Sequence, residues 1–546
     1  MSTSETVKSK QDSEVLLLTG KDLTLETIVR VARAAQQETG FPQVGLDPSV
    51  REHLILVRDY IEKNWLKDDA PIIYGFNSGV GKLKDTRIAP EENDLFQRLM
   101  IESHCSGIGE AAREDVVRAT MLMRANSLAK GVSGVRIQVV ERLLEMLNRG
   151  VHPVIPLLGS VGASGDLAPM AHLVSALVGH PEAEVFYQGE RLSAQEGLTR
   201  AGMEASFQMK AKDVLGMING CTFTLGMAVL AAHDARRAAK LADVACALSM
   251  EAMRGEMGAF EPRIQEVRNH PGQIRAAENI RQLLAGSQWT TDEARKIKLK
   301  EEVRSGEWQP RVQDAYSLRC VPQVHGAVLD VLDFVDQILV REANAATDNP
   351  LMFREENGEY VGLSGGNFHG EYLAFAMDFL TVAVHELGNI SERRSARLLD
   401  PTMSYGLPRN LVGTSVGLNT GFTLAQCSAA ALVSENKTLC YPASADSIPT
   451  KSNQEDHVSM ATWAARKAGM VISNMFKILG IEILCAAQGV SCAEPQLEGL
   501  SLAPKTRKVY NRLRQDIPAT GDDRYMNKQM RLAIALAEAD AFLLEE

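Results

Sequence analysis

Three consecutive small residues, Ala163, Ser164 and Gly165, offer the most specific chemistry in this sequence. They lie in a glycine- and serine-rich stretch that follows a proline-punctuated apolar run, and Pro169 marks the first turn of an expected helix. Because Gly165 has no Cβ, its amide nitrogen can fold back onto the carbonyl carbon of Ala163. Ring closure and dehydration of Ser164 would leave an exocyclic methylidene on a five-membered ring, which is an electrophile made from the backbone.

Two simpler interpretations of this stretch have to be weighed. Average residue usage makes an Ala-Ser-Gly tripeptide a chance event in roughly one chain in five of this length, so the tripeptide alone is a weak signal. A nucleophile elbow requires Gly-x-Ser-x-Gly, and Asp166 stands where the second glycine belongs. The elbow is excluded, and the chance explanation depends on whether other sites supply what such an electrophile requires.

A glycine-rich stretch at residues 74–83, YGFNSGVGKL, is the second candidate. Its glycines and Lys82 suggest a phosphate loop, but the spacing is one residue too long for Gly-x4-Gly-Lys. In addition, Leu83 replaces the Ser or Thr that binds magnesium in such loops. A flexible loop with one tyrosine instead predicts a lid that brings Tyr74 to a substrate as a base.

Gln313, Tyr316 and Arg319 are spaced three residues apart, so on a helix they form one stripe. An arginine grips a carboxylate through two parallel N–H bonds, which a lysine does not reproduce. The stripe is therefore a candidate carboxylate clamp, with an ordinary solvent-facing stripe as the alternative.

Histidines and carboxylates occur together in two segments, residues 364–371 (SGGNFHGE) and 453–460 (NQEDHVSM). Neither segment has the His-x3-His spacing of a metal site, and residues 385–389 (HELGN) lack the second histidine of a zincin motif. We therefore expect no metal. His104, in the segment ESHCSG at 102–107, is a lone histidine, which is more often structural than functional.

The composition of the 546 residues limits the class of protein. With 45% hydrophobic and 23% charged residues, the chain is typical of a soluble globular protein. A formal net charge of -11 argues against a nucleic-acid or anionic-membrane partner. Eight cysteines form no Cys-x-x-Cys and suit a reducing cytosol, and there is no signal peptide or apolar run of membrane-spanning length. We expect a soluble, cytoplasmic protein.

Helical periodicity dominates the chain. It predicts helices at 24–37 and 47–65, one long buried helix over about 212–253, and further long helices at 321–345, 370–400, 415–436 and 457–488. Hairpin-like inserts at 184–192 and 352–362 are the exceptions, and strand–helix alternation is missing.

We therefore expect an all-α fold with a long central helical bundle and a loop-rich N-terminal region that carries the reactive stretch. The predicted division is a flexible tail at 1–20, an N-terminal region at 21–235, and the bundle with the C-terminal helices at 236–546. Long apolar helices of this kind commonly bury themselves against sister subunits, so we also expect a homo-oligomer.

The stretch at 159–173, GSVGASGDLAPMAHL, closely resembles the signature of the aromatic amino acid lyases that carry a 4-methylideneimidazol-5-one (MIO) prosthetic group. The other candidate sites match this family's motifs in the same chain order, from about residue 70 to about residue 490. The resemblance implies that MIO forms from Ala163-Ser164-Gly165 without an external cofactor. It also implies elimination of ammonia from an aromatic L-amino acid, and a homotetramer whose active sites take residues from more than one subunit.

The resemblance assigns roles to individual residues. Tyr74 would remove the substrate's β-proton, Arg319 would bind its carboxylate, and Phe368 would lie beside the prosthetic ring. The residues that would hold the prosthetic group and the substrate's amino group are Asn219, Gln313 and Tyr316.

Two positions depart from the family's pattern. Val80 stands where the mobile loop usually has a bulky aromatic residue. Cys221-Thr222-Phe223 stands where the family usually has Thr-Gln or Thr-Ala, so the packing beside Asn219 is in question.

Ser103, His104 and Glu455 occupy the positions that read the substrate's side chain in this family. The Ser-His pair resembles histidine ammonia-lyases and some tyrosine aminomutases, whereas phenylalanine-specific relatives carry Phe-Leu and many tyrosine-specific ones His-Leu. Histidine lyases have Glu at the position of Glu455, where the phenylalanine and tyrosine enzymes generally have Gln. A carboxylate accepts an imidazole N–H or an ammonium charge more strongly than an amide does.

The expected reaction is therefore conversion of L-histidine to urocanate. A tyrosine or phenylalanine ammonia-lyase, or a 2,3-aminomutase, is the alternative within the family. A catalytically inactive helical relative that serves as a scaffold is the alternative from a different class.

Overall fold

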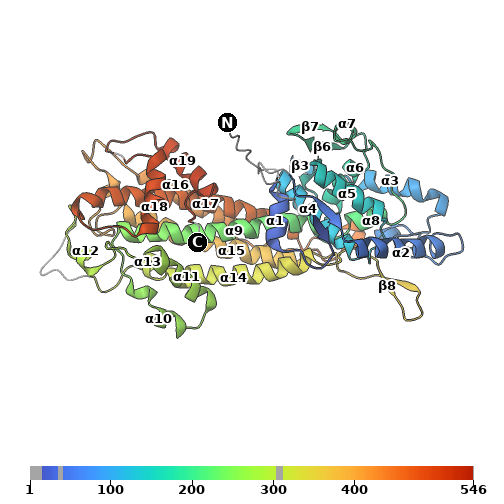
Figure 1. Cartoon of the computed structure of the whole chain (residues 1–546), viewed down its shortest axis with the longest axis horizontal. Coiled ribbons are helices and arrows are strands. Elements are labelled where there is room, and N and C mark those ends of the chain that lie inside the picture. The colour runs from blue at the N-terminus through green and yellow to red at the C-terminus, as the bar shows by residue number, and fades with distance from the viewer. Residues whose placement is uncertain (1–14, 35–40, 303–310, 520, 545–546) are drawn as a thin grey trace, which may run out of the picture. The chain divides into compact units, whose positions relative to one another are not determined.

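The computed structural model describes residues 15–34, 41–302, 311–519 and 521–544. Residues 1–14, which form most of the tail predicted at 1–20, lie outside the described residues. Helices account for most of the described chain and the sheets are small (Figure 1). The predicted all-α class with long helices is confirmed.

The helices are α1 (Leu25–Ala32), α2 (Pro48–Asn64), α3 (Asn93–His104), α4 (Glu114–Ala129), α5 (Ile137–Arg149), α6 (Leu167–Leu177), α7 (Ala194–Arg200), α8 (Asp213–Ile218), α9 (Thr222–Ala252), α10 (Pro262–Glu266), α11 (Pro271–Leu283), α12 (Asp292–Lys296), α13 (Tyr316–Arg319), α14 (Val321–Ala343), α15 (Glu371–Leu398), α16 (Thr423–Leu439), α17 (Ala461–Ala493), α18 (Pro504–Asp516) and α19 (Met526–Glu538). The strands are β1 (Leu16–Leu18), β2 (Val44–Leu46), β3 (Ile108–Ala111), β4 (His152–Pro153), β5 (Pro156–Leu158), β6 (Glu184–Tyr187), β7 (Glu190–Ser193), β8 (Leu351–Arg354) and β9 (Tyr360–Leu363).

The chain forms two compact units, each assembled from three segments. The first consists of Met1–Leu230, Gln337–Phe375 and Ala443–Ala465, and the second of Ala231–Asp336, Ala376–Pro442 and Arg466–Glu546. The continuous division predicted at residue 235 stays a prediction. That division does not include two later segments, Gln337–Phe375 and Ala443–Ala465, which also belong to the first unit. Local sequence patterns do not reveal their place in the fold.

Four small sheets lie in the first unit, and their strands pair as β1-β2, β3-β5, β4-β6-β7 and β8-β9. The two hairpins predicted near 184–192 and 352–362 are confirmed as β6-β7 and β8-β9. The first hairpin turns at Gln188 and Gly189, which both have positive φ (51° and 80°). Such a two-residue turn matches the twist of the strands that it joins.

Helix α4 is the centre of the first unit. All its residues from Asp115 to Ala129 are buried, and it packs against α1, α2 and α5. Because the helix is enclosed on all sides, its charged side chains need partners inside the protein. Arg118, for example, donates to the carbonyl oxygens of Val31 (3.0 Å) and Leu147 (3.1 Å).

The single helix predicted over 212–253 is wrong at one point, because α8 ends at Ile218 and α9 begins at Thr222. Asn219 is extended and Gly220 has φ +110°, so the backbone leaves the helical path. The freed groups bind elsewhere: Gly220 N donates to Ser164 O (3.1 Å), and Asp166 N donates to Gly220 O (3.0 Å). The break in the helix therefore supplies two backbone hydrogen bonds to the reactive stretch.

The helix at Glu371–Leu398 and the one at Ala461–Gln496 are long and apolar enough to cross a membrane by length and composition. Neither is an uninterrupted apolar run, and their most apolar windows are 67% and 83% buried inside the chain. Burial of this extent is typical of the core helices of a folded protein.

A buried ion pair joins α15 to α17 in the second unit. Arg394 donates to both carboxylate oxygens of Glu482, at 2.5 and 2.9 Å, and both side chains are fully buried. Ser249 on α9 donates a further hydrogen bond to the same carboxylate (2.7 Å). Two charges removed from water in this way stabilise the fold only while both are present.

We therefore expect Glu482→Ala to lower the free energy of unfolding by about 3–5 kcal/mol, because Arg394 would stay charged and buried without its partner. Glu184→Ala is the matched control, since it breaks an exposed pair with Arg191 and should cost at most about 1 kcal/mol. Urea-induced unfolding followed by circular dichroism measures both variants. Equal losses would contradict the role assigned to the buried pair.

Candidate active site

The reactive stretch forms a tight loop that leads into α6. Gly165 has φ +79° and pairs with Gly220 through an isolated bridge between the two backbones. A Cβ at Gly165 would lie 2.1 Å from the carbonyl carbon of Gly220, so this position accepts only glycine. The close approach holds Ser164 and its neighbours in one backbone conformation.

Asp166 anchors the end of this loop inside the protein. Its fully buried carboxylate accepts hydrogen bonds from Thr224 N (2.7 Å), Thr224 Oγ1 (2.8 Å), Ser160 Oγ (2.8 Å) and Thr462 Oγ1 (3.0 Å). Burial raises the pKa of this carboxyl group, against the hydrogen bonds, which lower it. The loop, the start of α9 and the start of α17 are thus tied to one side chain.

Asn219 contacts the reactive stretch directly. Its Nδ2 donates to Ser164 O (2.8 Å), and its Oδ1 is buried without a hydrogen-bond partner among the described residues. Arg124 on α4 holds the same break between α8 and α9, because its Nη2 donates to Asn219 O (2.8 Å) and Thr222 Oγ1 (2.6 Å). Arg124 therefore holds the backbone of Asn219 in place, and the side-chain Oδ1 of Asn219 has no hydrogen-bond partner among the described residues.

Glu455 reaches the hydroxyl of Ser164, which donates a hydrogen bond to its Oε1. Lys451 Nζ donates to the same oxygen (2.7 Å), and Thr450 Oγ1 donates to Oε2 (2.7 Å). Burial alone would raise the pKa of Glu455, but the hydrogen bonds from Lys451, Ser164 and Thr450 lower it below its usual value. The site therefore holds a carboxylate ion.

A cavity of about 320 Å³ lies in front of these groups. Its lining includes Ser103 and His104 from the end of α3, the reactive tripeptide, Lys451 and Glu455. His104 Nδ1 contacts Met100 O at 2.8 Å. Burial, with a smaller contribution from the charge of Lys451, lowers the pKa of this imidazole, so the ring is neutral at pH 7.

Comparisons with known proteins agree with this geometry. A family model described as aromatic amino acid lyase matches residues 23–515. The chain belongs to this family. Histidine ammonia-lyase 2 of Fusobacterium nucleatum subsp. nucleatum is 45% identical over 510 residues, which cover 93% of this chain and 94% of that protein.

Solved structures of the family are also similar. The crystal structure of histidine ammonia-lyase from Trypanosoma cruzi has a TM-score of 0.84 and 38% identity, and the match covers 97% of this chain and 94% of that chain. The structure of tyrosine aminomutase from Streptomyces globisporus has a TM-score of 0.87 and 35% identity, covering 97% of this chain and 98% of the other. The relatives named histidine ammonia-lyase indicate that the chain is a carbon–nitrogen lyase.

The structure brings together part of the predicted lyase site. Within the first unit, Ser103, His104, Ser164 and Glu455 line one cavity, and Asn219 lies behind it. Tyr74 and Phe368 belong to the same unit but are not among the residues that line this cavity. The hydroxyl of Tyr74 accepts a hydrogen bond from Gly81 N (3.1 Å) within its own loop.

The predicted carboxylate clamp belongs to the second unit. Tyr316 and Arg319 form the one-turn helix α13, and the Arg319 guanidinium lies 4.6 Å from the centre of the Tyr316 ring. Tyr316 is 69% exposed, and Gln313 is also exposed. The predicted shared helical stripe is therefore confirmed for Tyr316 and Arg319, whereas Gln313 precedes the helix.

Cys221, which belongs to one of the two departures from the lyase pattern, is buried beside the reactive loop. Its buried thiol contacts Phe368 O (3.4 Å) and Gly162 O (3.9 Å), and burial raises its pKa well above the usual value. The neutral thiol therefore fills space between the reactive loop and residue 368.

Three further residues contact Glu455 or Asn219 although no motif in the sequence marks them: Lys451, Thr450 and Arg124. Lys451 lies four residues before Glu455, but the intervening backbone is no regular helix: Lys451, Ser452 and Asn453 all have positive φ (49°, 54° and 60°). Residue spacing therefore does not predict the contact.

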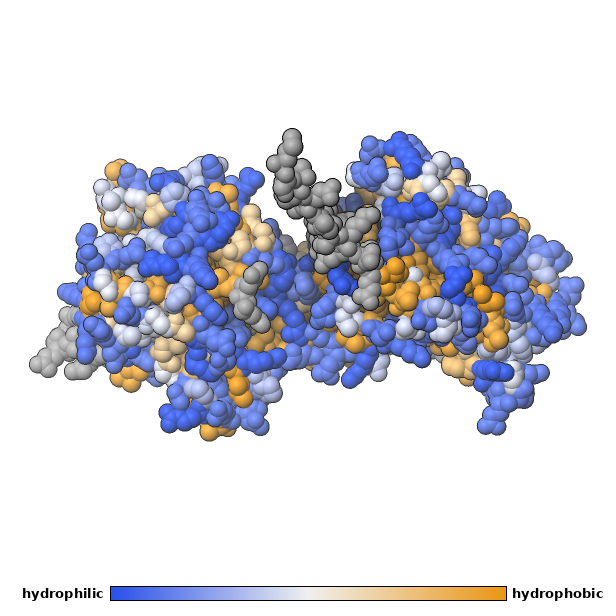
Figure 2. Space-filling model, in the orientation of Figure 1, coloured by the Kyte–Doolittle hydropathy of each residue, from blue (hydrophilic) through white to orange (hydrophobic). Residues whose placement is uncertain are grey.

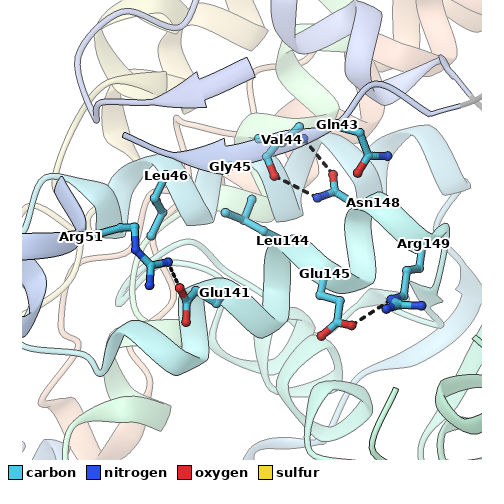
Figure 3. Close-up of a pocket in the computed structure, with 10 residues that line it drawn as sticks. All are labelled: Gln43, Val44, Gly45, Leu46, Arg51, Glu141, Leu144, Glu145, Asn148 and Arg149. Carbon is cyan, nitrogen blue, oxygen red and sulfur yellow. Dashed lines mark hydrogen bonds and ion pairs between the residues drawn. The ribbon is translucent and has the colours of Figure 1, made fainter. Parts of the chain in front are cut away.

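A second hollow, of about 470 Å³, lies beside β2 and α5 (Figure 3). Its charged side chains are paired with one another, Arg51 with Glu141 and Arg149 with Glu145 (2.8 Å). Asn148 binds both the N–H and the carbonyl oxygen of Val44 at 2.9 Å. Since its charged groups are already paired with one another, we assign no chemistry to this hollow.

We expect Lys451→Met to raise the pKa of His104, because the charge of Lys451 lowers it. The pKa should stay below its usual value, since burial is the larger cause. NMR titration of the His104 ring measures the change, with Lys84→Met, at an exposed lysine paired with Asp85, as the control. An identical His104 titration in the unmodified protein and in Lys451→Met would contradict this electrostatic contact.

Proposed function

We propose that this chain is a histidine ammonia-lyase, which converts L-histidine to urocanate and ammonia. The observation that carries the proposal is the Glu455 carboxylate, which contacts Ser164 inside the cavity that Ser103 and His104 line. An ionised carboxylate and a neutral imidazole are suited to bind a polar ring that carries N–H groups. The relatives named histidine ammonia-lyase support the same substrate.

The residues at 163–165 fit the MIO group that characterises the family, and we propose that it forms from them. Gly165 approaches Gly220 too closely for any Cβ, and Asn219 Nδ2 holds Ser164 O, so the loop is constrained before any covalent change. When present, the group supplies an electrophile for the substrate's amino nitrogen.

Formation of this group would remove the Ser164 hydroxyl as water, and that hydroxyl is one of the hydrogen-bond donors to Glu455 Oε1. Lys451 and Thr450 remain on the carboxylate and keep it ionised. One acceptor position that faces the cavity is then free for an N–H group of the substrate's ring. Glu455 would then accept a hydrogen bond from the substrate's ring in place of the one from Ser164.

The remaining roles follow from chemistry and from the family. We propose that Tyr74, whose hydroxyl oxygen accepts a hydrogen bond from Gly81 N, removes the β-proton as a general base. Arg319 would bind the carboxylate, Phe368 would lie beside the prosthetic ring, and Gln313 and Tyr316 would contact the amino group.

We further propose a cytoplasmic homotetramer with shared active sites. Helix α15 carries a row of exposed apolar side chains at helical spacing: Tyr372, Phe375, Phe379 and Val382, which are 44–72% exposed. A row of this kind is typical of a helix that packs against another chain. On the face shown in Figure 2, hydrophilic residues predominate, with apolar groups in smaller patches.

The deciding experiment is ultraviolet monitoring of the purified protein with histidine, tyrosine and phenylalanine separately. We expect urocanate to form from histidine. Coumarate or cinnamate without urocanate would replace the substrate by tyrosine or phenylalanine, and a β-amino acid product would indicate a 2,3-aminomutase.

We expect Ser164→Ala to fold normally and to lose activity by orders of magnitude, because the hydroxyl and Cβ of Ser164 are needed to build the electrophile. Borohydride should inactivate the unmodified enzyme and change its near-ultraviolet absorbance, and should leave the spectrum of the variant unchanged. Ser106→Ala, at a cavity residue with only a 3.5 Å contact to His104 O, is the control. Near-normal turnover by Ser164→Ala would contradict the proposed mechanism.

We expect Glu455→Gln to lower kcat/KM for histidine about 10- to 100-fold, since a hydrogen bond to a charged group contributes about 1.5–3 kcal/mol. Its unfolding midpoint should change little. Glu102→Gln is the matched control, because this partly exposed carboxylate lies next to Ser103 on α3 and is absent from the cavity lining. Equal effects of the two substitutions on kcat/KM would refute Glu455 as the group that reads the ring.

A further inference from the structure

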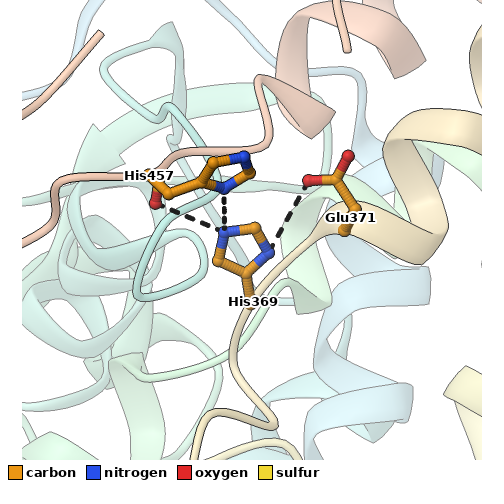
Figure 4. A group of neighbouring side chains, drawn as sticks. All are labelled: His369, Glu371 and His457. Atoms are coloured by element: carbon orange, nitrogen blue, oxygen red, sulfur yellow. Dashed lines mark hydrogen bonds and ion pairs between the residues drawn. The ribbon is translucent and has the colours of Figure 1, made fainter. Parts of the chain in front are cut away.

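His369, Glu371 and His457 lie together in the first unit, although Glu371 and His457 are 86 positions apart in the chain (Figure 4). His369 lies two residues before α15, Glu371 is the first residue of that helix, and His457 lies four residues before α17. If each residue offers one ligand atom, all three atoms lie within 4.8 Å of one another. None of these residues lines the Ser164 cavity.

Hydrogen bonding accounts for only part of this cluster, since His369 Nε2 contacts the carbonyl oxygen of His457 at 3.3 Å. His369 Nε2 and His457 Nδ1 are 3.5 Å apart, and His369 Nδ1 and Glu371 Oε2 are 3.8 Å apart, which are long for hydrogen bonds. Glu371 Oε2 is buried and accepts no hydrogen bond from the described residues. A carboxylate oxygen in this situation normally has a strong partner.

These separations fit a shared cation better. Ligand atoms bound to zinc at about 2.0–2.2 Å in a tetrahedron lie about 3.4 Å apart. His457 is exposed and the other two side chains are 28% and 30% exposed, so small rotations about their side-chain bonds can bring three ligand atoms to that spacing. Two imidazoles and one carboxylate favour zinc and similar transition metals over magnesium or calcium.

We propose that His369, Glu371 and His457 form a binding site for a divalent transition metal such as Zn²⁺, with the fourth position open to water. His-x3-His spacing is missing because the ligands come from two separate segments rather than from one helix. The site stands on this geometry alone and does not depend on the substrate proposed above.

A metal bound at this cluster would affect the reactive loop that carries Ser164. The two segments that supply its ligands also hold the reactive loop, because Gly370 N and Ser459 Oγ both donate to Gly162 O at 3.0 Å. Met460 N donates to the neighbouring Val161 O (2.9 Å). A bound ion would join these segments a few residues from those contacts and stabilise the loop that carries Ser164.

The test is zinc titration of the full-length protein after treatment with a chelator, in a Cys427→Ser background that removes an exposed thiol. We expect one Zn²⁺ per chain, and affinity about 100-fold weaker or worse in His369→Gln and in His457→Asn, because each variant loses a metal ligand. His270→Asn, at an exposed histidine of the second unit, is the matched control and should bind as the background does. Circular dichroism confirms that each variant is folded.

Two further measurements separate a metal site from a chance cluster. Zn²⁺ should raise the melting temperature of the background protein and of His270→Asn, and leave that of His457→Asn unchanged. Co²⁺ should give the visible absorption of a four-coordinate site, absent in His369→Gln. Failure of Zn²⁺ to bind, or binding that His369→Gln and His457→Asn leave unchanged, would overturn the proposal.

Discussion

The contact between the backbones of Gly165 and Gly220 is the constraint on which the candidate site depends. Gly220 N binds Ser164 O, Asp166 N binds Gly220 O, and a Cβ at Gly165 would overlap the Gly220 carbonyl carbon. The two strands of backbone approach this closely because neither carries a side chain there. The break between α8 and α9 exists to make this contact, and it places Asn219 against the reactive stretch.

Buried polar side chains hold this contact in place from behind. Asp166 ties the loop to the starts of α9 and α17, and Arg124 ties the break between α8 and α9 to α4. Both charged groups are buried, and the Asp166 carboxylate and the Arg124 Nη2 form hydrogen bonds with the loop's surroundings. Such fully buried networks stabilise one conformation, because every alternative leaves a charge without a partner.

The charge arrangement in front of the loop defines what the cavity can bind. Lys451 and Thr450 keep Glu455 ionised, and burial together with Lys451 keeps His104 neutral. The cavity therefore presents an anionic acceptor and a neutral ring beside the residue proposed as the source of the electrophile. This combination suits a substrate with a polar nitrogen ring and disfavours a purely apolar one.

The residues of the Ala163-Ser164-Gly165 stretch, the expected chemistry, the helical class and the two hairpins could all be predicted from the sequence. Each depends on local composition, on turn residues such as Gly189, or on helical periodicity, which a linear pattern records. The family resemblance added Ser103, His104 and Glu455 as readers of the side chain, and the structure brings these three together around one cavity.

Only the tertiary structure decided the contacts made across long separations. Lys451 reaches Glu455 through a turn of three residues with positive φ, Arg124 reaches Asn219 from another helix, and His457 meets His369 from a separate segment. The sequence also did not reveal the break in the helix at residues 219–221. The apolar pattern continues through these residues, and their hydrogen bonds go to a loop more than fifty residues away in the chain. The helical propensity of these residues does not decide their conformation, because their buried backbone groups form hydrogen bonds with residues 164 and 166 instead.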